Sequence, residues 1–201
     1  MQSRSNAARF WPILVAVTVA DVLTKAIAER TLTPRGIPHE VLGNTVRFTL
    51  VYNPGAAFGL NLGPQSRWIF GALTVIALGI LARLYRSTIE GDHWRTVALA
   101  LVCAGAIGNL LDRMRSFFGV VDFIDVGIGD SRWPTFNVAD MAVSVGAVLL
   151  ALVLWQEDRT ILARASDNAL ASPPVTPSPV AASPSSPIPA SASGGEPGDL
   201  G

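Results

Sequence analysis

The chain has 201 residues, of which half are hydrophobic and only 15% are charged, and its formal net charge is zero. A soluble domain carries about a quarter charged residues and a nucleic-acid-binding domain is usually basic, so the composition argues against both classes. The single cysteine excludes an internal disulfide, and two histidines far apart in sequence argue against a zinc site.

Four stretches have the length and polarity of membrane-spanning helices, which need about 20 mostly apolar residues. They are residues 10–28, 68–85, 96–111 and 138–155, and the third is short for a span. The five tryptophans stand near the ends of these stretches, as interfacial aromatic anchors do. A cleaved signal peptide is the alternative for the first stretch, but three further spans follow it. We therefore predict an all-α membrane protein with four transmembrane helices.

The first loop, residues 29–67, combines a β-like segment at 46–53 with a run of turn-forming residues at 53–64. We predict that this outside loop forms a small β-rich cradle on the membrane surface. The second outside loop spans residues 112–137. The arginines divide evenly between the two sides of the membrane, but the outside loops are longer, so the density of positive charge favours both termini inside.

From about Ser166 onward the chain consists largely of alanine, serine and proline, and eight of the fourteen prolines lie there. Such a segment cannot bury a core, so we expect it to be disordered. We predict two parts, a membrane domain over residues 1–165 and a disordered tail over residues 166–201.

Polar residues at span ends are functional candidates, because ionisable groups in a membrane are costly. Asp21 and Lys25 are four residues apart and share a helix face, where they could also be a simple neutralising ion pair. Asn109 with Asp112 closes the third span, and Asn137 with Asp140 opens the fourth. Helix capping, a salt bridge and the helix dipole are the structural alternatives for these pairs.

If both spans meet the outer surface, four acids gather at one membrane depth, namely Asp112, Asp122, Asp125 and Asp140. Two close carboxyl groups cannot both ionise easily, so they share one proton. The ionised member can take a proton from water while the protonated member polarises a peptide carbonyl. Such a pair hydrolyses peptides with neither a metal nor a nucleophilic side chain. Spacing does not choose which acids form the pair.

Several short motifs occur together in this chain: "YNPGAAFG" at 52–59, "GNLLDR" at 108–113, "VVDFIDV" at 120–126 and "FNVAD" at 136–140. With the pair in the first span, they resemble the lipoprotein signal peptidases over roughly residues 8 to 160. The resemblance implies an intramembrane aspartyl endopeptidase that removes signal peptides from prolipoproteins, cutting just before a diacylglyceryl-modified cysteine. It assigns catalysis to Asp122 and Asp140, although Asp125 is the rival of Asp122. The matching positions that shape the site or hold substrate are Asp21, Lys25, Asn53, Gly55, Asn109, Asp112, Arg113, Asn137 and Ala139.

The resemblance further implies a multi-pass protein of the bacterial inner membrane, with both termini cytoplasmic and the active site near the outer face. The expected partners are lipid-modified prolipoproteins and membrane lipids, and we expect a monomer without cofactor, metal or nucleic acid. A proton-coupled transporter is a competing hypothesis, but it predicts acids at the midplane and an internal repeat. A noncatalytic scaffold packed through small residues is another, but it leaves the clustered acids without a role.

Overall fold

The computed structural model describes residues 4–55 and 62–171. Two compact units make up the chain, residues 1–162 and 163–201, and the site described below lies in the first. Residues 166–171, which open the predicted tail, belong to the last helix, and residues 172–201 lie outside the described part. Ala56 and Ala57 of the "NPGAAFG" run also lie outside it.

The described residues form four long helices, α1 (Arg4–Thr31), α2 (Ser66–Arg86), α3 (His93–Arg115) and α4 (Val138–Ala171). All four are long and apolar enough to cross a membrane, which confirms the predicted spans. The third span, which looked short in the sequence, extends to 23 residues because His93–Arg95 and Asp112–Arg115 continue its helix. The chain is therefore a multi-pass membrane protein.

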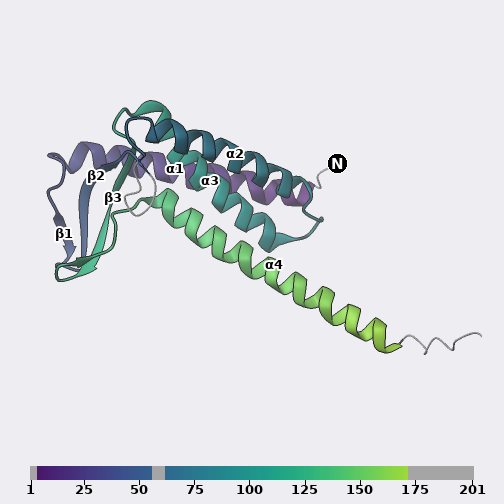
Figure 1. Cartoon of the computed structure of the whole chain (residues 1–201). Helices are drawn as coiled ribbons and strands as arrows, with labels where there is room; N and C mark the ends of the chain where they lie inside the picture. Colours follow the sequence, from purple (N-terminus) through teal and green to yellow (C-terminus); the bar gives the residue numbers. More distant parts are fainter. Residues whose placement is uncertain (1–3, 56–61, 172–201) are drawn as a thin grey trace, which may run out of the picture. The chain divides into compact units, whose positions relative to one another are not determined.

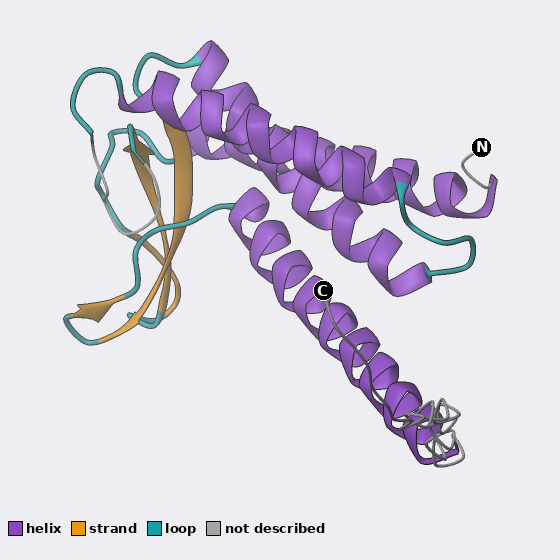
Figure 2. Cartoon of the chain, turned by 45° about the vertical axis from the view of Figure 1, so that its right-hand side comes forward, coloured by secondary structure: helices purple, strands orange, loops and turns teal. Residues whose placement is uncertain are grey.

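A small antiparallel sheet connects the ends of these helices, with the strand order β1-β2-β3-β4. Its strands are β1 (His39–Leu42), β2 (Val46–Asn53), β3 (Val120–Ile128) and β4 (Ser131–Arg132). Figures 1 and 2 show α1, α2 and α3 side by side, with the sheet at one end of them. The predicted strand at 46–53 is confirmed as β2.

Half of the sheet comes from the loop after the third span, residues 112–137, for which no strand was predicted. Residue Val51 of β2 pairs with Asp122 of β3, and Asn53 pairs with Val120. Gly119 makes this pairing possible, because its φ of +102° is strained for other residues and an added Cβ would overlap the backbone of Asn53. Pairing between the two loops thus places "VVDF" beside "YNP".

Close packing of α3 against its neighbours depends on glycine. An added Cβ at Gly108 would overlap the carboxylate of Asp21 in α1, and one at Gly105 would overlap the carbonyl oxygen of Ala139 in α4. An added Cβ at Gly146 of α4 would come within 2.7 Å of the Val102 side chain and 2.9 Å of the carbonyl oxygen of Ala98 in α3. These small residues let the helix backbones approach, as is common where membrane helices pack.

Replacing Gly105 with alanine is therefore expected to destabilise the protein. The added methyl group meets a backbone oxygen that cannot rotate away, so we expect a loss of roughly 1–3 kcal/mol. The measurement is the thermal unfolding midpoint of the purified protein in detergent. Gly79→Ala in α2 is the matched control, because nothing lies within 4 Å of its added Cβ. Equal midpoints for the two variants would contradict the close approach of α3 and α4.

Candidate active site

A cavity of about 600 Å³ lies between the sheet, α3 and the first turns of α4. Asp122 of β3 and Asp140 of α4 are the two carboxylates among its described lining residues. Asn53, Asn109 and Arg113 also line it. The fold thus brings both acids predicted as catalytic to one space, although they come from different elements.

Asp122 is almost fully buried, with 3% of its surface exposed. Burial raises the pKa of this carboxyl to about 7, and the negative charge of Asp140 raises it further. Hydrogen bonds from Asn137 and Asn53 favour the ionised form without cancelling that effect. Asp122 therefore holds a proton at far higher pH than an ordinary aspartate.

Asp140 belongs to the first turn of α4 and forms a reciprocal cap with Asn137. The Asn137 Oδ1 accepts from the backbone N–H of Asp140 at 2.9 Å, and Asp140 Oδ2 accepts from the backbone N–H of Asn137 at 3.2 Å. Asp140 Oδ1 accepts from Asn109 Nδ2 at 2.8 Å. Helix capping, which the sequence offered as an alternative to a functional role, therefore also positions Asp140 in the cavity.

Two amide side chains connect the acids to each other. Asn137 Nδ2 lies 2.7 Å from Asp122 Oδ1 and 3.2 Å from both Asn109 Oδ1 and the carbonyl oxygen of Val121. Because Asn137 also caps the helix at Asp140, one asparagine touches both carboxylates. Its fully buried side chain holds Asp122, and its backbone N–H holds Asp140.

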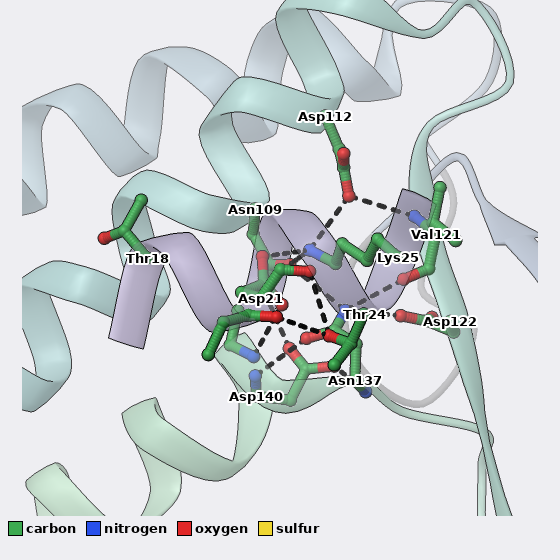
Figure 3. A network of polar contacts seen from close by, with 12 residues as sticks. Thr18, Asp21, Thr24, Lys25, Asn109, Asp112, Val121, Asp122, Asn137 and Asp140 are labelled. Atoms are coloured by element: carbon green, nitrogen blue, oxygen red, sulfur yellow. Dashed lines mark hydrogen bonds and ion pairs between the residues drawn. The ribbon is translucent and has the colours of Figure 1, made fainter. Parts of the chain in front are cut away.

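The ammonium group of Lys25 lies among Asp21, Asn109 and Asp112, as Figure 3 shows. Its Nζ lies 2.8 Å from Asp21, 2.9 Å from Asp112 and 2.9 Å from Asn109 Oδ1. The side chains of Asp21 and Lys25 are fully buried and that of Asp112 is 3% exposed. The ion pair expected from the spacing of Asp21 and Lys25 is present, and Asp112 is a second carboxylate that pairs with the same ammonium group.

The two carboxylates on Lys25 each hold a backbone N–H next to one of the acids. Asp21 Oδ1 accepts from the N–H of Ala139 at 2.9 Å, and Asp112 Oδ2 accepts from the N–H of Val121 at 3.2 Å. These are the residues directly before Asp140 and Asp122. Ala139 is fully buried, packs beside Gly105 and Gly108, and is not among the described residues that line the cavity.

Arg113 lines the cavity and joins it to the first loop. Its guanidinium donates to the carbonyl oxygens of Asn109 at 3.1 Å and Gly55 at 3.0 Å. Asn53 Oδ1 in turn accepts from the N–H of Gly55 at 3.0 Å. These bonds hold Gly55 beside Arg113 of the cavity lining.

Asp125 does not line the cavity. It accepts hydrogen bonds from Arg47, Thr49 and Arg132, at 2.9 to 3.2 Å. Burial alone would raise the pKa of Asp125, but these hydrogen bonds outweigh it and hold the pKa below its usual value. Side chains three apart on a strand point to opposite faces, so only one of Asp122 and Asp125 can face the cavity.

The sequence analysis missed much of the cavity wall. Residues 133–136 form one side, where Phe136 exchanges backbone hydrogen bonds with Ile124 at 2.8 and 3.0 Å. Met141, Ser144 and Val145 of α4 form another. Their spacing gives one helix face, but lipid-facing and cavity-facing apolar residues look alike in a sequence, so no signal separated them.

Residues 13–156 match the family described as Signal peptidase (SPase) II. The chain belongs to this family. It is 35% identical over 147 residues to the lipoprotein signal peptidase of Halothermothrix orenii, covering 73% of this chain and 94% of that protein. It is 39% identical over 154 residues to that of Pseudomonas aeruginosa, strain UCBPP-PA14, covering 74% of this chain and 88% of that protein.

A solved structure described as a bacterial membrane enzyme, determined by the in meso method at 2.3 Å resolution, has the same fold. The TM-score is 0.67 at 33% identity, and the likeness covers 74% of this chain and 88% of the other. The resemblance stated from the motifs is thus confirmed. Membership in the signal peptidase II family indicates a peptidase and argues against both the transporter and the scaffold.

Replacing Lys25 with methionine is expected to lower stability by roughly 3–5 kcal/mol, because Asp21 and Asp112 are left buried without their cation. The thermal midpoint in detergent measures the loss. Arg86→Met, at an exposed arginine in the last turn of α2, is the control and is expected to change little. A Lys25→Met protein as stable as the control would contradict the role assigned to this ion pair.

The raised pKa of Asp122 predicts how stability depends on pH. The unfolded chain loses this proton near pH 4 and the folded chain near 7, so the folded state binds more protons between those values. Stability therefore decreases as pH rises from about 4 to about 7 and levels off above. Thermal midpoints of the wild type and Asp122→Asn across this range isolate the contribution. A constant difference between the two proteins would show that Asp122 has an ordinary pKa.

Proposed function

We propose that this chain is an intramembrane aspartyl endopeptidase that removes signal peptides from diacylglyceryl-modified prolipoproteins, cutting before the lipidated cysteine. The observation that carries the aspartyl mechanism is that Asp122 and Asp140 line one cavity and are bridged by Asn137. The substrate class is taken from the relatives, which are named lipoprotein signal peptidases.

In this proposal the pair shares one proton, held by Asp122, whose pKa is raised to about 7. The ionised Asp140 takes a proton from water as the water oxygen bonds to the scissile carbonyl carbon. Asp122 gives its proton to the carbonyl oxygen, which forms a neutral gem-diol. A proton from Asp140 then reaches the amide nitrogen, the C–N bond breaks, and a gem-diol hydroxyl returns its proton to Asp122. The two acids end as they began, and no cofactor or metal takes part.

The hydrogen bonds of the two acids favour this division of roles. Both carboxylate oxygens of Asp140 accept hydrogen bonds, one from Asn109 and one from a backbone N–H, which suits the role of the base. Asp122 is more deeply enclosed, so its neutral form is favoured. The supporting polar residues fall into two groups in this proposal. Asp21, Lys25, Asn109, Asp112, Asn137 and Ala139 hold the acids, and Asn53, Gly55 and Arg113 meet the substrate backbone.

The location of the cavity suits a substrate that is partly in the membrane. It adjoins the start of α4 and the end of α3, where two spans leave the hydrocarbon region. A lipid-modified cysteine is held at that level by its acyl chains. We place this end at the outer face of the bacterial inner membrane, with both termini cytoplasmic, because the shorter opposite loop has the higher density of positive charge.

We propose a monomeric enzyme, because Asp122, Asp140 and the asparagines that hold them all belong to the same chain. None of the described residues that line the cavity lies beyond Val145, so we assign the peptidase to residues 1–165 and give the tail, residues 166–201, no part in hydrolysis.

Asp122→Asn and Asp140→Asn are each expected to reduce cleavage of a diacylglyceryl-modified precursor by about a thousandfold, the usual scale for losing an acid or base. Asp125→Asn is the matched control, since this acid lies three residues from Asp122 and outside the cavity lining. We expect it to keep most activity per folded molecule while losing thermal stability. Substantial activity in Asp140→Asn, or equal loss in all three variants, would refute the assignment of the pair.

A further inference from the structure

A second hollow, of about 380 Å³, lies near the cavity but shares no described lining residue with it. Its walls come from the end of α1, from β2, and from the end of α3 with the turn that follows. They are formed by Glu29, Tyr52, Arg115, Ser116, Phe117 and Phe118.

The hollow lies at the depth where two membrane spans end. Glu29 belongs to the last turn of the span Ser5–Thr31, and Arg115 is the final residue of the span His93–Arg115. The two side chains form an ion pair of 3.2 Å, so both helix ends are at the same level. In a bilayer this is the level of the lipid head groups.

One positive charge beside the hollow, that of Arg35, forms no ion pair with a carboxylate among the described residues. The guanidinium of Arg35 stacks 4.3 Å from the centre of the Tyr52 ring and 4.1 Å from that of Phe118. The carboxylate of Glu29 is already shared between the hydroxyl of Tyr52, at 2.9 Å, and Arg115. No carboxylate of the described chain pairs with Arg35, and its guanidinium stacks on two aromatic rings that line the hollow.

Apolar side chains continue the hollow along the membrane-facing side of α3. Phe117 is 82% exposed and Met114 is 66% exposed, and Leu111 lies three residues before Met114 on the same helix face. The turn that presents Phe117 is held by Arg67, which donates to the carbonyl oxygen of Ser116 at 3.1 Å. A charged pocket followed by an exposed apolar strip matches the two parts of a phospholipid.

We propose that this hollow binds the head group of an anionic phospholipid, with its phosphate at Arg35 and Arg115 and its acyl chains along Leu111 and Met114. One unpaired positive charge matches a lipid of one net negative charge better than a zwitterionic lipid, whose ammonium group would face Arg35. The hydroxyl of Tyr52 adds a hydrogen-bonding group for a neutral polar head. The proposal does not depend on the peptidase function.

The bound lipid also contacts the framework of the cavity. Arg115 Nε donates to Asp112 Oδ1 at 2.9 Å, and Asp112 Oδ2 holds the N–H of Val121 at 3.2 Å. Val121 directly precedes Asp122. A phosphate at Arg115 therefore lies two hydrogen bonds from the strand that positions this acid.

The test is native mass spectrometry of the full-length protein in detergent, titrated with phosphatidylglycerol or with phosphatidylcholine of the same acyl chains. The wild type is expected to bind phosphatidylglycerol roughly tenfold more tightly, the size of one charged hydrogen bond. Arg35→Gln is expected to abolish this preference. Arg86→Gln is the control, because it removes an exposed arginine from the last turn of α2, far along the chain from the hollow.

Glu29→Gln provides a prediction of opposite sign, because it removes the negative charge from the hollow and should strengthen phosphatidylglycerol binding several-fold. A folding defect would weaken binding in both hollow variants, so the pair separates charge recognition from misfolding. Equal losses in Arg35→Gln and Arg86→Gln would overturn the proposal, as would equal affinity of the wild type for the two lipids. Displacement of the lipid by inorganic phosphate alone would reduce the hollow to a plain anion site and overturn the lipid assignment.

Discussion

The rest of the site depends on the ion pairs of the Lys25 ammonium group with Asp21 and Asp112. A buried ion pair stabilises a fold only when its remaining polar atoms are satisfied, and here each carboxylate on Lys25 also accepts from a backbone N–H. One of those amides starts α4 and the other belongs to β3 (Figure 3). Asp21 and Asp112, both paired with Lys25, thus hold α1 and α3 to α4 and to the sheet. The residues that follow the two clamped amides are Asp140 and Asp122.

The asymmetry between the two acids has a local cause. Asp140 stands in a helical first turn, where a reciprocal cap with Asn137 and the positive end of the helix dipole both favour a carboxylate. Asp122 stands on a strand, almost fully enclosed, next to that negative charge. The pKa of Asp122 is raised because this carboxyl is enclosed on its strand and lies near the charge of Asp140. In the proposed mechanism, the carboxylate of Asp140 that caps the helix is also the base.

The cavity and the second hollow both lie where membrane spans end, on two sides of the chain segment that joins α3 to β3. Charged groups are tolerated there because water and lipid head groups are within reach, while the apolar helix faces below them remain in hydrocarbon. Asp112 contacts both regions through Lys25 and Arg115. Anchoring to lipid and positioning of the acids thus share one buried carboxylate.

The sequence by itself determined the four spans, the strand at 46–53 and the ion pair of Asp21 with Lys25, because each depends on local composition or helical spacing. The family motifs identified the chain, while residue spacing left Asp122 and Asp125 equivalent as candidates. Only the tertiary structure decided which of them faces the cavity, which residues of 133–145 form its wall, and that the second loop supplies half of the sheet. These features depend on pairing between segments some seventy residues apart. The alternation of side chains along a strand tells which of them faces the cavity only once the register of β2 and β3 is known.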